Sequence, residues 1–384
     1  MAAIAPPFPF ASPAKVDFMR RDLFARVQQA SPRPVVTSDN ARFYRPDLDL
    51  LRFFAFLLVF YGHALGHTRV GALGVPVFFL LSAYLITELL LRELDRTGSI
   101  EIKSFYMRRI LRIWPLYFAV LVAGCCVAHA AEKNGFSFYA MVSYIFLCGN
   151  WYCVAHGYLP LGLGGLWSIS VEEQFYLIWP NVVRLIQRNG LLWFSATLWA
   201  ICQIIVVFLC LQGKTINPTI WTNSLSQFQY FAIGSMISVL LNRAVPRMSM
   251  ALRVVVVLCG LGAFIWADRV FDTTGYGVAS LRSTYPGYLL VGLGASLIFF
   301  GFLGTRVAAW MSPLVYLGKI SYGLYIFHQI VILVVSKIPA GSFEHPIHAG
   351  IALAITIVIA ALSYRYFETP FLRLKQRFEI VQSR

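Results

Sequence analysis

Long apolar runs recur along the chain from Asp49 onward. Each holds about 17 to 25 residues, which is enough to cross a hydrocarbon core of roughly 30 Å as a helix. No run shows the alternation of an outer-membrane β-barrel. Ten spans are predicted, at roughly 49–67, 72–92, 112–131, 166–186, 191–211, 226–242, 253–268, 285–303, 316–337 and 348–366. The pattern therefore predicts an all-α, multi-pass membrane protein.

Lysines and arginines cluster in every second connection between these spans. Such clusters face the cytoplasm, so we predict a protein of the cytoplasmic (inner) membrane with both termini on the cytoplasmic side. The apolar segment 136–153 would invert this parity if it crossed the membrane. It is therefore predicted to be a re-entrant or interfacial segment on the outer side.

Composition supports the bilayer as the solvent, since 58% of the 384 residues are hydrophobic and only 13% are charged. The net charge of +15 would also suit nucleic-acid binding. However, the arginines lie at the ends of apolar runs, where they orient helices, so no nucleic-acid partner is predicted. The seven cysteines show no zinc spacing, and no metal is predicted. Cys148 and Cys153 could pair if their loop faces an oxidising compartment.

Three regions are predicted. Residues 1–47 contain several prolines and are expected to form a flexible cytoplasmic tail, residues 48–372 the membrane domain, and residues 373–384 a cytoplasmic C-terminal tail. Within the first tail, "DFMRRDLFARVQQ" favours either disorder or a surface helix with apolar residues on one side.

The first predicted span, "LDLLRFFAFLLVFYGHALGH", contains Arg52 and His63. Eleven positions place them on nearly the same helix face, roughly 16 Å apart along the axis. Ionisable groups at membrane depth are costly unless they face a cavity or a partner, which favours a functional role. A neutral histidine can act as a general base near neutral pH. The alternative is that Arg52 reaches the interface and His63 only packs between helices.

Three arginines, Arg108, Arg109 and Arg112, open the third span in "FYMRRILRIWPLY". Guanidinium groups at the start of a helix favour phosphate binding. The alternative is ordinary anchoring at the cytoplasmic interface.

The fourth span begins "LWSISVEEQFYLIWP", which places Ser168, Glu172 and Tyr176 on one helix face. A buried carboxylate needs a partner, either a histidine that it orients or an arginine such as Arg52. The ninth span carries Tyr322 and His328 in "GKISYGLYIFHQ". Tyrosines at such spacing usually pack, and a lone histidine of this kind is more typical of a core.

Six segments in order complete the picture: "DLLRFFAFLLVFYGH", "GVPVFFLLSAYLI", "RRILRIWPLY", "LWSISVEEQFYLIWP", "LGKISYGLYIFH" and "YFETP". Together they resemble the integral-membrane acyltransferase family 3, whose members O-acylate cell-envelope carbohydrates. The resemblance covers about residues 47 to 372. Ala83 and Leu50 stand where the family usually has glycine, and neither departure touches the expected chemistry.

The resemblance implies roles for matching positions. Arg52 and His63 match an essential arginine and the catalytic histidine, and Arg109 and Arg112 match a pair associated with the acyl-coenzyme A donor. Other matching or candidate site positions are Phe79, Ser82, Trp167, Ser168, Glu172, Tyr322 and His328. Some family members carry a fused extracytoplasmic esterase-like domain; this chain is expected to be a stand-alone transferase.

The expected reaction moves an acyl group, by default acetyl, from acyl-coenzyme A to a hydroxyl of a carbohydrate or lipid-linked glycan. His63 would be the general base and Glu172 would orient it. Arg108, Arg109 and Arg112 would hold the donor phosphates, and Arg52, Ser82 or Tyr322 would stabilise the oxyanion. A covalent acyl-enzyme is an open second route. The rival from another class is a transporter or flippase of lipid-linked sugars.

Overall fold

The computed structural model describes residues 43–65, 69–130, 137–338 and 344–381. Most of the predicted N-terminal tail, with its possible surface helix, lies outside these ranges. Regular structure in the described part is helical, apart from one isolated bridge between Thr215 and Val278.

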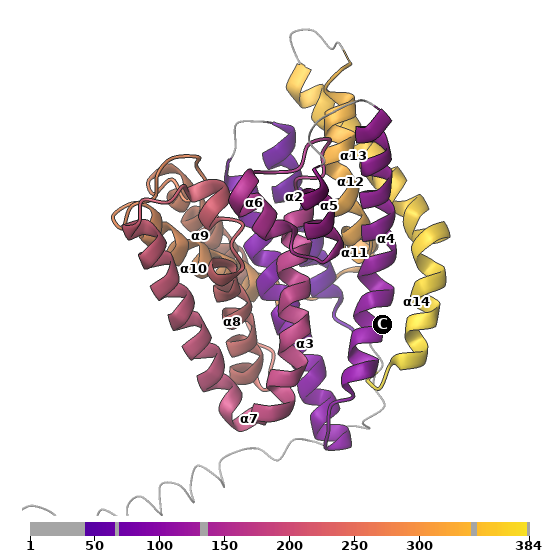
Figure 1. Cartoon of the computed structure of the whole chain (residues 1–384). Coiled ribbons are helices and arrows are strands. Elements are labelled where there is room, and N and C mark those ends of the chain that lie inside the picture. The colour runs from indigo at the N-terminus through magenta and orange to yellow at the C-terminus, as the bar shows by residue number, and fades with distance from the viewer. Residues whose placement is uncertain (1–42, 66–68, 131–136, 339–343, 382–384) are drawn as a thin grey trace, which may run out of the picture. The chain divides into compact units, whose positions relative to one another are not determined.

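The main helices pack side by side (Figure 1). They are α2 (Pro46–Ala64), α3 (Gly74–Thr97), α4 (Ile102–Ala130), α7 (Leu166–Leu211), α8 (Ser224–Leu241), α9 (Met250–Arg269), α10 (Thr284–Phe302), α12 (Ser321–Val335) and α13 (Glu344–Leu362). Shorter elements connect or flank them: η1 (Arg69–Leu73), α5 (Phe138–Ile145), α6 (Gly149–His156), η2 (Ile216–Ile220), η3 (Ala309–Met311), α11 (Ser312–Lys319), η5 (Ser363–Glu368), α14 (Thr369–Lys375) and η6 (Gln376–Phe378).

Seven helices of the described chain are long and apolar enough to cross a membrane, or eight if one bent pair counts as a span. This confirms an all-α, multi-pass membrane protein, although the count differs from the predicted ten. The long helix α7 contains both predicted spans 166–186 and 191–211, with non-helical dihedral angles at Gln187 between them. Helix α2, the predicted first span, has 19 residues but is not among the seven, because its first turns contain the three charged residues Asp47, Asp49 and Arg52.

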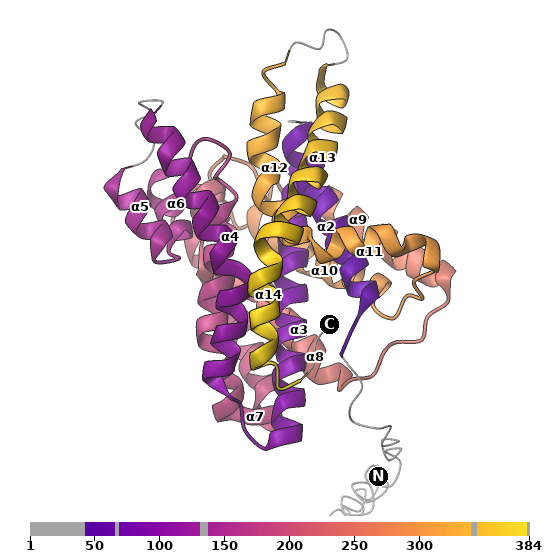
Figure 2. The ribbon, with the colours of Figure 1, turned by 90° about the vertical axis from the view of Figure 1, so that its right-hand side faces the viewer.

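The predicted ninth span, 316–337, is not one straight helix. The segment Ala309–Lys319 meets α12 at an angle of 66°, and α11 turns away from α12 toward α2 (Figure 2). Helices α11 and α2 touch at Gly318 of α11, where a Cβ atom would lie 1.7 Å from the carbonyl oxygen of Asp49 in α2. The missing side chain at Gly318 therefore lets α11 pack directly on the backbone of α2.

The apolar segment 136–153 does not cross as a single helix. It forms α5 and the start of α6, two helices of eight residues each, and neither is long enough to span a bilayer. The Asn150 side chain fixes α6 because its amide donates to the Thr222 carbonyl at 3.1 Å and to Ser224 Oγ at 2.8 Å. The expectation that this segment does not cross the membrane as one helix is confirmed, while its re-entrant or interfacial place on the outer side stays a prediction.

Cys148 and Cys153 are both free thiols in the structure, so the possible pair is not formed. Cys153 is buried and its Sγ lies 3.2 Å from the Tyr144 hydroxyl. Burial raises the pKa of this thiol to about 11. Cys153 therefore stays protonated and unreactive near neutral pH.

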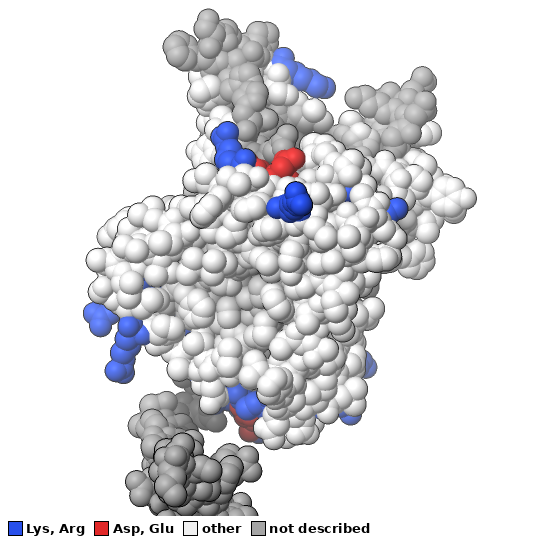
Figure 3. All heavy atoms as spheres, turned by 90° about the vertical axis from the view of Figure 1, so that its left-hand side faces the viewer, with Lys and Arg blue, Asp and Glu red and all other residues white. Residues whose placement is uncertain are grey.

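Three basic connections meet at one end of the helix bundle. Asp95, near the end of α3, pairs with Arg188 at 2.8 Å and also with Arg243. These arginines belong to the bend of α7 and to the loop after α8. Figure 3 shows charged side chains mainly toward the ends of the visible face, with an uncharged band between them.

The chain remains helical past residue 372. Helix α14 and then η6 run to Phe378 and pack beside α4 (Figure 2). Arg108 of α4 donates to the Phe378 carbonyl at 2.7 Å. The first residues of the predicted C-terminal tail thus belong to the packed structure.

Candidate active site

Three cavities follow one another through the bundle. The arginine cavity has a volume of about 90 Å³, the central cavity about 110 Å³ and the histidine cavity about 560 Å³. The arginine and central cavities share the walls Arg52, Ser82, Arg109, Arg112 and Tyr176. The central and histidine cavities share Val75 and Tyr325. The three cavities therefore form a series through the protein, called the route below, and Val75 and Tyr325 lie between the central and histidine cavities.

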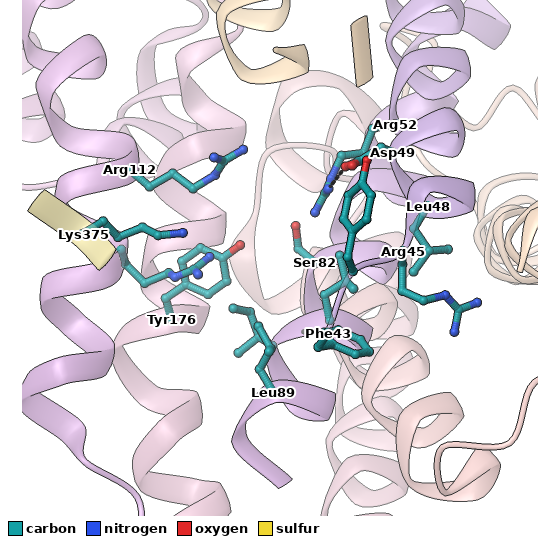
Figure 4. Close-up of a pocket in the computed structure, with 14 residues that line it drawn as sticks. Phe43, Arg45, Leu48, Asp49, Arg52, Ser82, Leu89, Arg112, Tyr176 and Lys375 are labelled. Atoms are coloured by element: carbon teal, nitrogen blue, oxygen red, sulfur yellow. Dashed lines mark hydrogen bonds and ion pairs between the residues drawn. The ribbon is translucent and has the colours of Figure 1, made fainter. Parts of the chain in front are cut away.

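Cationic side chains from three helices converge on the arginine cavity. Figure 4 shows Arg112 and Lys375 extending from one side and Arg52 from the other. Arg52 pairs with Asp49 at 2.5 Å, and Lys375 pairs with Glu379 at 3.1 Å. Arg112, in contrast, forms no salt bridge with any carboxylate in the described part of the chain.

Arg109 likewise has no carboxylate within salt-bridge distance among the described residues. Its guanidinium instead lies 5.6 Å from the ring centre of Tyr176 and 5.8 Å from that of Phe105. Its Nε atom is buried and has no hydrogen-bond partner within the described ranges. Cations held at membrane depth without a counter-ion favour an anionic ligand.

Arg108 differs from its neighbour. It donates to Glu93 at 3.1 Å and to the Phe378 carbonyl at 2.7 Å, and it lines none of the three cavities. The predicted trio of phosphate-binding arginines is therefore separated: Arg109 and Arg112 face the cavity, and Arg108 ties α4 to α3 and the C-terminal segment. The reason is the helical rotation of about 100° per residue, which turns adjacent side chains apart.

Glu172 lies in the central cavity and accepts hydrogen bonds from Ser82 Oγ at 2.5 Å and from the Tyr176 hydroxyl. The expected contact with His63 is not formed, and Arg52 pairs with Asp49 rather than with Glu172. The helix face of Ser168, Glu172 and Tyr176 is present as predicted, and it lines the central cavity. Glu173 points elsewhere and accepts from Trp114 Nε1 at 2.8 Å.

His63 lies on the wall of the histidine cavity, beyond Arg52 along α2. Its Nε2 atom is 3.0 Å from Gln329 Nε2. The Gln329 amide is oriented by Gly165, whose backbone N–H donates to Gln329 Oε1 at 2.9 Å. An amide NH₂ group only donates, so His63 Nε2 accepts. The imidazole is therefore neutral in this arrangement and carries its proton on Nδ1.

His328 is buried behind His63, with ring centres 5.4 Å apart. Its Nδ1 lies 2.5 Å from the Tyr325 carbonyl oxygen, while its buried Nε2 has no hydrogen-bond partner in the part of the chain that the structure describes. His328 does not line the histidine cavity. Its position agrees with a packing histidine that supports the wall.

The remaining predicted residues surround the cavities. Trp167 lines the histidine cavity, and Ser168 Oγ lies 2.6 Å from the Tyr325 hydroxyl. Tyr322 lines the central cavity, but its hydroxyl already donates to the Ile113 carbonyl at 2.6 Å. Phe79 stacks on Phe231 with ring centres 4.7 Å apart.

Sequence reasoning missed Gln329, Gly165 and Lys375. The polar amide of Gln329 within the apolar run "IFHQIVI" was the available signal. Nothing local to the sequence indicates that the Gly165 backbone, 164 positions away, fixes that amide. Lys375 was assigned to a tail, because the packing of α14 on α4 is a long-range feature.

Comparison with known proteins identifies a matching family and several similar proteins. The model of a family described as "Acyltransferase domain" matches residues 45–365. The peptidoglycan O-acetyltransferase OatA of Listeria monocytogenes is 26% identical over 87% of this chain and 57% of its own length. The O-acetyltransferase OatA of Staphylococcus aureus is 27% identical over 85% of this chain, and a putative O-acetyltransferase of the same species is 29% identical over 85%.

The chain thus spans about 57% of the length of these curated relatives. No solved structure matches it. The family match covers most of the chain, including every cavity-lining residue of α2, α3, α4 and α7. The protein therefore belongs to the integral-membrane acyltransferase family described as "Acyltransferase domain".

Proposed function

We propose that this protein is a membrane O-acyltransferase that moves an acyl group, by default acetyl, from acyl-coenzyme A to a hydroxyl of a cell-envelope carbohydrate. The observation that carries the proposal is the route of three cavities. At one end lie Arg109 and Arg112, which have no carboxylate partner among the residues described in the structure, and at the other end lies neutral His63. The relatives named as peptidoglycan or putative O-acetyltransferases support the same reaction class.

The donor enters from the arginine cavity. Arg109 and Arg112 bind the phosphates of coenzyme A, because guanidinium groups form strong charge-assisted hydrogen bonds with phosphate oxygens. Lys375 adds a third cation to this wall. The thin acyl-pantetheine arm then passes the central cavity, where Ser82, Glu172 and Tyr176 offer polar contacts along the way.

The acceptor binds in the histidine cavity. Its walls include aromatic rings from Trp167, Trp221, Tyr158 and Tyr276, together with the amides of Asn217 and Gln329. No Asp, Glu, Lys or Arg is among the described residues that line it. Aromatic faces combined with neutral hydrogen-bonding groups suit an uncharged sugar ring.

Acyl transfer takes place between His63 and the residues Val75 and Tyr325, where the central and histidine cavities adjoin. His63 Nε2 releases Gln329 and accepts the proton of the sugar hydroxyl as that oxygen attacks the thioester carbonyl. A new C–O bond forms and the C–S bond breaks. The imidazolium then returns the proton to the departing thiolate, so coenzyme A leaves as a thiol. The Tyr325 hydroxyl, on the wall shared by both cavities, donates to the developing oxyanion.

The test compares wild type, His63→Ala and His156→Ala in the same host, with the envelope glycans weighed by mass spectrometry. His156 is an exposed histidine at the end of α6 that lines none of the three cavities, so it is the matched control. Wild type and His156→Ala should both add the mass of an alkali-labile acyl ester. His63→Ala should not.

Equal modification by His63→Ala and wild type would remove His63 from the mechanism. Carbohydrate that crosses the membrane without gaining an ester would instead support the transporter reading. Purified protein with radiolabelled acetyl-coenzyme A tests the donor, because label must appear on the glycan in the same His63-dependent way.

A further inference from the structure

A second basic cavity lies outside the route of the three cavities. It has a volume of about 780 Å³ and is formed where α9 begins and α10 ends. Its lining residues are Val245, Pro246, Arg247, Met248, Ser249, Met250, Arg253, Gly304 and Arg306. None of these described lining residues is acidic. The cavity therefore carries three positive charges without a carboxylate among its walls.

Arg253 forms the floor and is only 6% exposed. Its Nη1 donates to the carbonyls of Leu303 at 2.6 Å and Gly301 at 3.2 Å, and its Nη2 donates to the Pro246 carbonyl at 3.1 Å. These partners orient the guanidinium but supply no negative charge. Nη1 also reaches the Thr305 hydroxyl oxygen at 3.4 Å, so all of these partners are neutral oxygens. A buried cation that is held by neutral oxygens gains stability from an anion nearby.

Arg247 and Arg306 form the rim, and both are exposed. Neither forms a salt bridge with a carboxylate in the part of the chain that the structure describes. Gly304, between them, has φ +81°, and a Cβ atom there would lie 2.3 Å from Val245 Cγ1. The backbone at this turn keeps the cavity open toward Arg253.

The apolar helix surface next to this cavity favours a membrane lipid as the source of the anion. The cavity lies at the ends of two helices that are long and apolar enough to cross a membrane. Next to it, the first turns of α9 expose Met250 (64%), Val254 (47%) and Leu258 (60%), which are spaced along one helix face. Acyl chains can cover such a face while a headgroup reaches the basic cavity at the interface.

We propose that this cavity binds the phosphate of an anionic phospholipid, with Arg253 on the floor, Arg247 and Arg306 on the rim, and the acyl chains along α9. The site is separate from the arginine cavity and does not depend on the proposed transferase activity. The lipid phosphate supplies the negative charge that the walls lack.

The experiment uses the full-length protein in detergent, stripped of lipid and then titrated with phosphatidylglycerol or phosphatidylcholine of the same chain length. Bound lipid is counted by native mass spectrometry. The test variant is Arg247→Gln/Arg306→Gln. The matched control is Arg269→Gln/Arg282→Gln, which removes two exposed arginines at and beyond the opposite end of α9. A third arm adds inorganic phosphate to the wild type.

Wild type should bind phosphatidylglycerol more tightly than phosphatidylcholine. Each rim arginine contributes about fivefold to such binding, so the test variant should bind phosphatidylglycerol about 25-fold more weakly. The control variant should match the wild type.

Equal binding of the two lipids, or an equal loss in the control variant, would overturn the proposal. Displacement of the lipid by millimolar inorganic phosphate would also overturn it, because the site would then take soluble phosphate rather than a lipid headgroup.

Discussion

At the scale of single residues, neighbouring side chains have divided roles. Arg109 lines the arginine cavity and has no carboxylate partner among the described residues. Arg108, in contrast, pairs with Glu93, whose side chain is buried (2% exposed). His63 depends on Gln329, and Gln329 depends on a single backbone N–H. Substitutions at these positions therefore separate ligand binding, chemistry and stability.

Arg109→Gln should raise the KM for acyl-coenzyme A by about tenfold or more, because a charge-assisted hydrogen bond to phosphate is lost. The melting temperature should change little, since no carboxylate loses its partner. Arg108→Gln is the counterpart: it leaves the buried Glu93 carboxylate with the Glu101 N–H but without its cation, which should cost about 3 kcal/mol of stability with the KM nearly unchanged. Steady-state kinetics and thermal denaturation in detergent measure both. A raised KM in Arg108→Gln alone would reverse the assignment.

Gln329→Leu should lower kcat by about tenfold or more, because His63 loses the donor that fixes its neutral tautomer and orientation. The KM for the acyl donor should remain near the wild-type value, since Gln329 lines the histidine cavity and neither of the other two cavities of the route. Gln329→Asn retains an amide but shortens the side chain, and partial recovery of kcat is expected. A change confined to the donor KM would place Gln329 elsewhere in the reaction.

At the scale of elements, close backbone contacts fix the position of α2, the helix that carries Arg52 and His63. Asp47 accepts from the Gly304 N–H at 2.6 Å, and α11 packs on α2 at Gly318. Ala83, which departs from the family pattern, is buried on α3 opposite Gly234 of α8, so its methyl group is accommodated by the neighbouring glycine. Small residues thus set the spacing of the helices that carry the site.

Gly318→Ala should lower the melting temperature by several degrees and reduce activity. The added methyl group cannot fit 1.7 Å from the Asp49 carbonyl, so α11 must move away from α2 and disturb the Asp49–Arg52 pair. Gly350→Ala is the control, because a Cβ atom there meets nothing within 4 Å and alanine favours a helix by about 0.5 to 1 kcal/mol. Equal melting temperatures of the two variants would contradict the proposed contact.

At the scale of the molecule, the described helices enclose a route from a cationic end to a neutral, aromatic end. This polarity suits two substrates of different chemistry that approach from opposite sides. Val75 and Tyr325 are the two residues that the central and histidine cavities share, so in the proposed reaction the acyl group passes between them.

Val75→Phe should block acyl transfer while coenzyme A still binds, because the larger ring fills the space between the central and histidine cavities and leaves the arginine cavity intact. Binding is measured by calorimetry with coenzyme A, and transfer by label on the glycan. Val75→Ile adds one carbon and should retain most of the activity. Full transfer by Val75→Phe would show that the acyl group takes another path.

The sequence by itself determined the features that depend on local pattern. Apolar runs indicated the helices, and the eleven-residue spacing placed Arg52 and His63 on nearly the same face of one helix. The parity of basic loops indicated that 136–153 does not cross the membrane as one helix. Four-residue steps likewise predicted the face of Ser168, Glu172 and Tyr176. Each of these rests on helical periodicity or on the length of an apolar run.

The tertiary structure alone decided which polar groups became partners. In the folded protein His63 contacts Gln329 rather than Glu172, and Arg108 pairs with Glu93. The predicted ninth span is bent, and Lys375 lies beside Arg112. These outcomes join segments up to 266 positions apart, as His63 and Gln329 show. A hydrophobic pattern specifies which face of a helix is buried, but the choice of partner across that face depends on the packing of every other helix.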